Sequence, residues 1–503
     1  MTPVDAYNDL RKYVSRFPLL ESLDVVRSYL QYFQFDEPLP AYIEFNGNVL
    51  KAGREGGIFE WTLEILAREL VLHAADYSTQ SLRQWSSFAN VMNKIHGLED
   101  AISAYYPELY TSNILIELYR IAHRQFPWQR RPSQADLLRY YKIFGGNAFD
   151  PIIQNAFGVN AQQLFMIGLV LTMFFVDRFA FELPPKIEGL PISLEEFNHV
   201  ASRVSIDLGP LRHLIAGAQS LDHDFAYTFD PIRSYPLLRA GDATSGSLLS
   251  PIPTFIFRRF TEGIYYDICS EPGFSDAFGP AFQSYVGEVV QKADLSGRFV
   301  VKAEAAYQVR KDRKDSVDWI VSDDTADLFV ECKTKKLRYG AKMGLASTEV
   351  LREDLNKMAT FLVQVYKTLN DALNGLYQHW EKRDKPVYPV VVTLEEWFAF
   401  GDKIVEALDK ALLEAMAAAN LDSAIIEAYP YTICAVEDFE LAIQVMGQTG
   451  IAPVMRERVT EPQRLWHMPS LLSAKFRKEV TKCRRNLFED DLGRIHPLLG
   501  RAK

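Results

Sequence analysis

The chain lacks the features that would place it outside the cell or give it a cysteine-based metal site. Its four cysteines lie far apart without paired spacing, which excludes a zinc ribbon and a disulfide framework, so we expect reduced thiols. The first residues show no basic segment followed by an apolar core, so no secretory signal is predicted. The most apolar run, residues 164–176, falls short of the roughly 20 residues that span a bilayer. We therefore expect a buried helix there and a cytoplasmic protein without a membrane role.

Positive charge is also scarce. The 55 Lys and Arg residues against 65 Asp and Glu give a formal net charge of -10, which argues against a protein that coats nucleic acid through bulk charge. The sequence also contains no Gly-x-x-x-x-Gly-Lys-Ser/Thr phosphate loop, no Gly-x-Ser-x-Gly elbow and no His-Glu-x-x-His zinc motif. Contacts with phosphates must therefore be local, and a motor activity within this chain is not expected.

The first half of the sequence has a helical pattern. With 503 residues, of which 48% are hydrophobic, the chain is expected to form two or three globular domains. Apolar residues recur at helical spacing in residues 1–227, and Ser133 and Ser193 stand where helix N-caps are expected. Residues 228–254, rich in Pro, Gly, Ser and Thr, are typical of a linker. We predict an all-helical N-terminal domain followed by this linker.

Residues 255–445 have the mixed pattern of an α/β domain, and residues 446–503 that of a C-terminal helical extension. The fold class predicted for the whole chain is therefore α + α/β. Within the mixed domain we expect helices and strands in alternation, the helices at 275–293, 347–376 and 402–419, and the strands at 299–308, 317–321, 328–334, 387–393 and 424–435.

One segment of this domain carries a chemically useful set of side chains. Residues 316–336 are expected to form two strands joined by a polar turn at 322–327. Because side chains alternate along a strand, Glu331, Lys333 and Lys335 share one face. Asp318 lies at the start of the partner strand. Two carboxylates at such a place suit a hard divalent cation completed by a substrate phosphate, and Lys333 can orient water or offset charge.

An upstream helix supplies a fourth candidate, Glu288, which lies among the apolar residues Phe282, Tyr285, Val289 and Val290. The order Glu288, Asp318, Glu331, Lys333 resembles the PD-(D/E)xK nuclease superfamily over residues 274–435, about a third of the chain. The resemblance implies a restriction-endonuclease-like αβββαβ core with a mixed central sheet. It also implies Mg²⁺ or Mn²⁺ held by Asp318, Glu331, Glu288 and the backbone carbonyl of Cys332, with Lys333 assisting the water.

The sequence departs from that pattern at two positions. Lys335 stands where many relatives have Gln, and Val317 stands where they have Pro, which leaves the subfamily open. A bare Glu-x-Lys is expected about twice by chance in a chain of this length. The alternative reading is a sheet-edge salt bridge between Glu331 and Lys333, within a catalytically inactive scaffold that binds nucleic acid or a protein.

Cations flank the candidate site and are the predicted nucleic-acid contacts: Arg310, Lys311, Arg313, Lys335, Lys336 and Arg338. A solvated loop compensated by Asp312 and Asp315 is the alternative. The favoured function is a metal-dependent nuclease that cuts DNA rather than RNA. By analogy with other fused nuclease domains, we expect a role in defence against foreign DNA, with the N-terminal domain binding a protein partner, nucleic acid or activating ligand, and with homo-oligomers as a further expectation.

Overall fold

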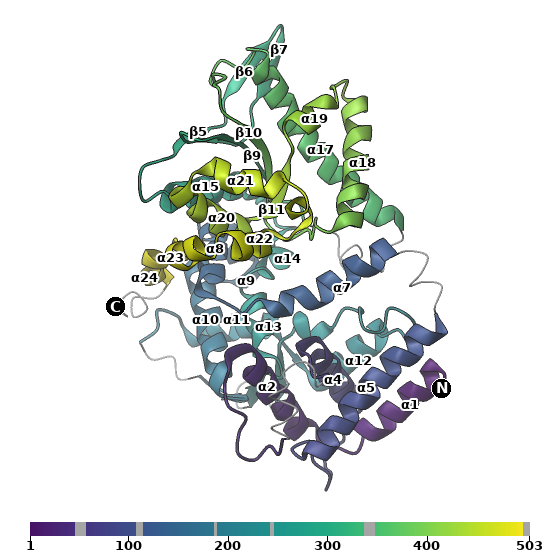
Figure 1. The fold of residues 1–503 in the computed structure, drawn as a ribbon. Helices are drawn as coiled ribbons and strands as arrows, with labels where there is room; N and C mark the ends of the chain where they lie inside the picture. The colour runs from purple at the N-terminus through teal and green to yellow at the C-terminus, as the bar shows by residue number, and fades with distance from the viewer. Residues whose placement is uncertain (46–56, 107–113, 186–188, 242–245, 337–347, 496–503) are drawn as a thin grey trace. The chain divides into compact units, whose positions relative to one another are not determined.

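The computed structural model describes residues 1–45, 57–106, 114–185, 189–241, 246–336 and 348–495 (Figure 1). Contacts between Cα atoms divide the chain into two compact units. The described residues of the first unit are 1–274 and 490–495, and those of the second run from 275 to 489. The boundary therefore lies at residue 275, rather than in the linker expected at 228–254.

The first unit is mainly helical. Its helices are α1 (Pro3–Val14), α2 (Leu19–Phe35), α4 (Glu60–His73), α5 (Trp85–Tyr105), α7 (Ile114–Gln129), α8 (Gln134–Phe144), α9 (Asp150–Phe157), α10 (Ala161–Asp177), α11 (Leu194–Val204), α12 (Leu208–Ala218), α13 (Pro253–Arg259), α14 (Ile264–Ile268) and α24 (Leu492–Ile495). The short 3-10 helices η2 (Pro231–Arg233) and η4 (Glu489–Asp491) complete the set, the latter starting at the last residue of the second unit.

The two predicted helix starts are confirmed. Ser133 caps α8 and Ser193 caps α11, and each forms a reciprocal capping box with the acidic residue three positions later, Asp136 or Glu196. These bonds satisfy backbone N–H groups that the first turn of a helix leaves without partners.

The apolar run at 164–176 also forms the expected buried helix, α10, in which Leu164, Phe165, Ile167 and Leu171 are buried. Within the described ranges no single helix is long and apolar enough to cross a membrane. Only α9 and α10 taken together reach that length and apolar character, and they are bent by 54°.

The expectation of an all-helical first half is wrong in one respect. A four-stranded sheet of order β1-β4-β3-β2 is formed by β1 (Ala180–Glu182), β2 (Ser205–Asp207), β3 (Leu237–Ala240) and β4 (Ser247–Leu249). Its strands have three or four residues, too few for alternation to show against the helical pattern around them. Apolar residues of the expected linker, Ile232, Leu238, Leu249 and Ile252, are buried in the core of the first unit. Two of the prolines there, Pro231 and Pro253, are the first residues of η2 and α13 instead of parts of a linker.

The second unit combines helices with a mixed sheet. Its helices are α15 (Phe274–Ala293, whose first residue belongs to the first unit), α17 (Thr348–Leu373), α18 (Asp402–Ala418), α19 (Ala424–Ala428), α20 (Val436–Thr449), α21 (Ile451–Val459), η3 (Gln463–Leu465), α22 (Met468–Lys475) and α23 (Arg477–Cys483). Its strands are β5 (Val300–Ala303), β6 (Ala306–Val309), β7 (Asp312–Asp315), β8 (Trp319–Ser322), β9 (Asp327–Lys333), β10 (Val387–Thr393) and β11 (Thr432–Ala435).

Five of these strands form the sheet that carries the candidate site, in the order β11-β10-β9-β8-β5. β8 is antiparallel to both of its neighbours, β5 and β9, whereas β9, β10 and β11 run parallel. β10 is buried over its whole length, so both faces of the sheet are covered there, and α17 packs on β9 and β10 while α20 packs on β10 and β11. Such coverage explains the nearly continuous apolar sequence of β10. β9 is the central strand.

Three expectations for this unit need correction. The strand expected at 299–308 is split into β5 and β6, because β6 pairs with β7 in a separate two-stranded hairpin. The strand expected at 424–435 begins with the short helix α19, and only its last four residues form β11. The expected C-terminal extension from residue 446 begins inside α20, and residues 446–489 belong to the second unit.

The approach of α15 to the sheet is set by one glycine. A Cβ atom on Gly287 would lie 2.3 Å from the ring of Trp319 on β8. That ring is held in place because its Nε1–H donates to the carbonyl of Gln283, one turn earlier in α15, at 2.9 Å. The helix therefore packs on β8 at a distance that no larger residue permits.

We expect Gly287→Ala to destabilise the protein by about 1–3 kcal/mol, the usual effect of an added group in a packed core. The measurement is the urea unfolding midpoint. Ser284→Ala, on the exposed face of the same helix, is the matched control and should change stability by less than about 0.5 kcal/mol. Equal midpoints for Gly287→Ala and the native protein would show that α15 can move off β8 freely.

Candidate active site on the central sheet

The predicted hairpin positions the two acidic residues. Trp319 pairs with Val330 across β8 and β9, and the polar turn lies between Ser322 and Asp327 as expected. Asp318 directly precedes β8, and its Oδ2 accepts a hydrogen bond from the backbone N–H of Cys332 at 2.6 Å. This bond holds the Asp318 carboxylate beside the last residues of β9.

Glu331 and Lys333 lie on one face of β9, as strand alternation predicts. The Lys333 ammonium donates to Glu331 Oε1 at 2.6 Å and also lies 5.2 Å from the centre of the Phe361 ring on α17. Glu331 is only 9% exposed. The salt bridge of the alternative reading is therefore present, and it lies near the end of the central strand β9.

The carboxylates repel each other in this setting. Burial raises the pKa of Glu331 to about 7, and the charge of Asp318 adds to the rise although Lys333 opposes it. Burial also raises the pKa of Asp318, against the lowering effect of the Cys332 hydrogen bond and of Lys333. Two acids with raised pKa values that share one ammonium are a common feature of functional sites.

A further acid, Glu304, contributes to this field and was not singled out from the sequence. Its charge raises the pKa of both Asp318 and Glu331, and its backbone N–H donates to the carbonyl of Asp318 at 2.8 Å. Gln283 of α15 reaches Glu304 Oε2 at 3.4 Å. The break between β5 and β6, which places Glu304 here, has no signal in the alternation of residues 299–308.

Glu288, the fourth predicted member, is half-buried on α15. Its role as a metal ligand stays a prediction. The same holds for the backbone carbonyl of Cys332. The Cys332 thiol itself is an unsuitable ligand, because burial and the charges of Asp318 and Glu331 raise its pKa well above the usual value and keep it protonated. All four cysteines are free thiols, as expected.

The predicted cations fall into different environments. Arg310 and Lys311 form the turn of the β6–β7 hairpin and Arg313 lies on β7, all three exposed. Lys335 is exposed just beyond β9. Lys336 is 7% exposed and its ammonium pairs with Glu395 at 2.7 Å, so its expected role as a phosphate contact is not supported. Arg338 lies outside the described residues.

Two other groups bring three metal-ligating side chains together within the described residues, and neither includes Asp318 or Glu331. One consists of Asp222, His223 and Asp224, and the other of Glu396, Asp438 and His467. In the second, burial lowers the pKa of His467, but the carboxylates of Asp438 and Glu396 outweigh it and raise the pKa to about 9. His467 is therefore a cation at neutral pH, a salt-bridge partner instead of a metal ligand.

The residues of the predicted site nevertheless fit a divalent cation. Asp318 and Glu331 offer oxygen ligands from adjacent strands, and burial raises the pKa of both carboxyl groups in spite of the nearby Lys333 ammonium. Substrate phosphate and water would have to complete the coordination, since the site supplies only two close side-chain carboxylates.

The raised pKa of Glu331 gives a test of its role. The pKa of Glu331 is 4.5 in the unfolded chain and about 7 in the folded protein, so the folded protein binds more protons between these two pH values. The free energy of unfolding therefore falls as pH rises from 4.5 to 7. In the presence of a chelator, Glu331→Gln should therefore equal the native protein in stability near pH 5. Near pH 8 the free energy of unfolding of Glu331→Gln should exceed that of the native protein by on the order of 1–3 kcal/mol.

The matched control is Glu406→Gln, which removes an exposed partner of Lys403 and should change stability little at either pH. Urea unfolding at the two pH values is the measurement. A large, pH-independent loss of stability in Glu331→Gln would identify the Glu331–Lys333 contact as a structural ion pair.

Comparisons with protein families, with curated proteins and with solved structures found no match to this chain. The site is therefore argued from its own geometry.

Proposed function

We propose that the second unit is a metal-dependent nuclease that hydrolyses phosphodiester bonds, with DNA as the favoured substrate. Asp318, Glu331 and Lys333 are its central residues. The observation that carries the proposal is the pair of carboxylates, buried Glu331 and half-buried Asp318, that lie beside the Lys333 ammonium at the end of the central strand.

The order of elements around the site supports the proposal. A helix (α15), three antiparallel strands (β5, β8 and β9), a helix (α17) and a parallel strand (β10) follow one another, which is the αβββαβ order expected from the resemblance to PD-(D/E)xK nucleases. The acids occupy the matching strands, Asp318 before β8 and Glu331 with Lys333 on β9. The β6–β7 hairpin is an insertion between the first and second strands of this order.

The residues can perform the steps that hydrolysis needs. A bound divalent cation would supply a water of lowered pKa and charge compensation at the phosphate. Lys333, held by Glu331, offers N–H donors to the attacking water or to a phosphate oxygen, where negative charge develops.

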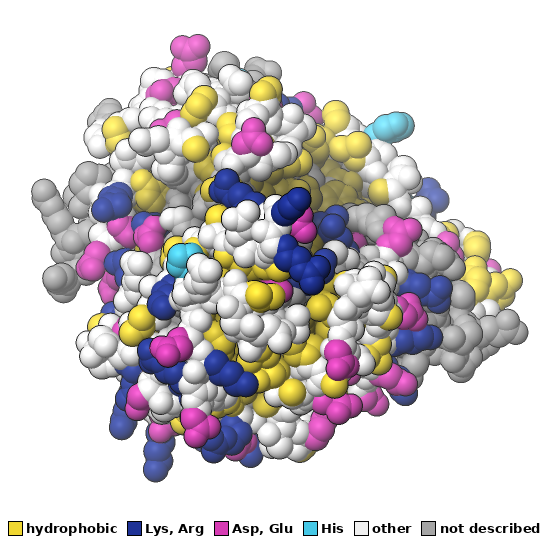
Figure 2. Space-filling model, turned by 90° about the horizontal axis from the view of Figure 1, so that it is seen from above, with side chains coloured by type: hydrophobic (Ala, Val, Ile, Leu, Met, Phe, Trp, Pro, Cys, Tyr) yellow, Lys and Arg dark blue, Asp and Glu magenta, His cyan; other side chains and the backbone are white. Residues whose placement is uncertain are grey.

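The exposed hairpin supplies a basic surface for the substrate. Arg310 and Lys311 at its turn and Arg313 on β7 are exposed. Figure 2 shows several Lys and Arg side chains together on one face of the chain. The hairpin is anchored to α17, because Tyr307 and Lys314 both donate to Asp371 Oδ2, at 2.8 and 2.7 Å. We infer that the hairpin holds Arg310, Lys311 and Arg313 in place for backbone phosphates.

The direct test is cleavage of plasmid, linear and single-stranded DNA and of RNA by the full chain with Mg²⁺ or Mn²⁺. Asp318→Asn, Glu331→Gln and Lys333→Gln should each lower the cleavage rate about 100-fold or more, because each removes a group that acts on the reacting phosphate or water. Binding of the uncleaved substrate should change much less.

Two matched controls remove a similar group elsewhere on the unit. Asp315→Asn, an exposed acid on β7, and Lys302→Gln, an exposed lysine on β5, should both keep the native rate. Cleavage that persists in the three site variants would refute the assignment. Binding of DNA without cleavage by any form, with either ion, would favour the inactive scaffold.

The hairpin gives a separate prediction. Replacing Arg310, Lys311 and Arg313 together by alanine should weaken DNA binding and reduce the slope of log affinity against log salt by up to about 3, roughly one unit for each phosphate contact. Fluorescence anisotropy across a salt series measures this slope.

The control variant replaces three exposed cations of α23, Arg477, Lys478 and Lys482, and it should leave the slope unchanged. A loss of slope in the α23 variant instead of the hairpin variant would place the DNA on the C-terminal helices.

A further inference from the structure

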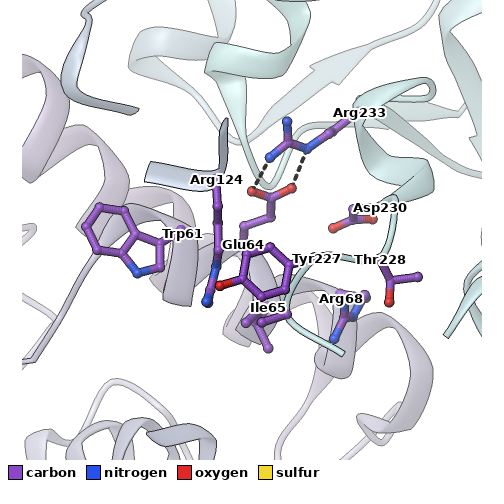
Figure 3. A pocket seen from close by; sticks show the side chains of 10 residues that line it. Trp61, Glu64, Ile65, Arg68, Arg124, Tyr227, Thr228, Asp230 and Arg233 are labelled. Atoms are coloured by element: carbon purple, nitrogen blue, oxygen red, sulfur yellow. Dashed lines mark hydrogen bonds and ion pairs between the residues drawn. The ribbon is translucent and has the colours of Figure 1, made fainter. Parts of the chain in front are cut away.

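The first unit contains a polar cavity that the proposed nuclease does not use (Figure 3). α4 supplies Glu64 and Arg68 to its wall, α7 supplies Arg124, and the segment leading into η2 supplies Asp230 and Arg233. Its empty space is about 370 Å³ including open solvent at its mouth. The cavity is therefore large enough for a small polar ligand.

Part of this wall is already paired. Arg233 donates to both carboxylate oxygens of Glu64, from Nε and from Nη2 at 2.7 Å, as the dashed lines in Figure 3 mark. Arg124 donates to Glu99 at 2.6 Å. The charges of Arg233 and Arg124 are therefore compensated by the carboxylates of Glu64 and Glu99.

Two buried side chains that line the cavity, Arg68 and Asp230, each have one polar atom without a partner, although Arg68 Nε donates to Glu69 Oε1 at 3.2 Å. Arg68 is 3% exposed and Asp230 is 2% exposed. Among the described residues, no atom makes a hydrogen bond with Arg68 Nη2 or with Asp230 Oδ2. The other atoms of the same side chains are bonded, since Arg68 Nη1 donates to the carbonyl of Phe225 and Asp230 Oδ1 accepts from the backbone N–H of Ile232. A buried polar atom without a partner is unfavourable by about 1–3 kcal/mol, so both atoms call for a ligand or water.

The chemistry of these groups selects the ligand. Burial, together with the charge of Glu64, raises the pKa of Asp230 to about 7. In its protonated form Asp230 can donate an O–H, and Arg68 can only donate. Arg68 Nη2 and the protonated Asp230 Oδ2 are then both hydrogen-bond donors without an acceptor. Two such donors fit the oxygen atoms of a ligand.

Aromatic side chains give the cavity a fixed shape. The Trp61 ring stacks on Phe59 with ring centres 4.6 Å apart and planes at 5°. The Tyr227 ring lies beneath the guanidinium groups of Arg120 and Arg124, at 4.0 and 5.4 Å. These contacts hold both rings in place in the wall of the cavity.

We propose that this cavity binds an oxyanion group, a carboxylate or a tetrahedral phosphate-like group, with Arg68 and Asp230 as the residues that recognise it. The ligand is a small acid or a phosphorylated small molecule whose charged end occupies the interior. The site lies wholly within the first unit and does not depend on the nuclease proposal.

The test uses calorimetry on the full chain with sodium acetate and sodium sulfate as probes, against sodium chloride at matched ionic strength. Binding of acetate alone identifies a carboxylate site, and binding of sulfate alone identifies a tetrahedral oxyanion site. Arg68→Gln should weaken either affinity about tenfold or more, because it removes the charged donor. Arg203→Gln, an exposed arginine of the same unit, should leave it unchanged.

Asp230→Asn provides a second variant that keeps a donor and the shape of the side chain. Above pH 6 both probes keep a constant charge, so the native affinity should fall between about pH 6 and 8.5 as Asp230 loses its proton. The charged groups that face Asp230 are Glu64, Arg68 and Arg233. The variant should bind equally well across this range.

Three results would overturn the proposal. They are no binding of either probe beyond that of chloride, an unchanged affinity in a folded Arg68→Gln variant, and a native affinity that does not change with pH.

Discussion

The hydrogen bond from the Cys332 amide to Asp318 Oδ2 is the contact on which the candidate site depends. This bond joins Asp318, the residue before β8, to the end of β9. Trp319 pairs with Val330 in the hairpin, and this register places Asp318 opposite Glu331. The same strand fixes Lys333 against Glu331, and the Trp319 indole, one residue after Asp318, fixes α15. A slip of one residue in this register would turn every one of these side chains to the other face of the sheet.

Carboxylates elsewhere in the unit show what a structural role looks like. Asp323, in the turn between β8 and β9, accepts from the backbone N–H groups of Thr325 and Ala326 through one oxygen and of Ile451 through the other. Asp318 and Glu331 accept fewer hydrogen bonds. Burial raises the pKa of both, and the charge of Asp318 adds to the rise for Glu331. Residues arranged in this way lower stability when ionised, and such an arrangement persists where it serves binding or catalysis.

The sequence predicted local structure better than pairing between distant segments. The caps at Ser133 and Ser193, the helix around residues 164–176 and the face shared by Glu331 and Lys333 depend on neighbours within a few residues, and all are confirmed. The small sheet of the first unit, the break at Glu304 and the pairing of Lys336 with Glu395 depend on contacts between distant parts of the chain. Periodicity contains no information on such contacts, which is why these features were missed.

The distribution of cations limits how an acidic chain meets a polyanion. Lys314 and Lys336, which lie near the candidate site in sequence, are bound to Asp371 and Glu395 and serve to anchor the fold. The cations at the hairpin turn, beginning with Arg310 in its left-handed conformation, are exposed. Because exposed charges are screened within about 10 Å at 0.1 M salt, the hairpin can attract phosphates only at short range. The net charge of -10 repels a polyanion at long range, so the proposed binding of DNA would require the exposed cations of the hairpin to approach it first.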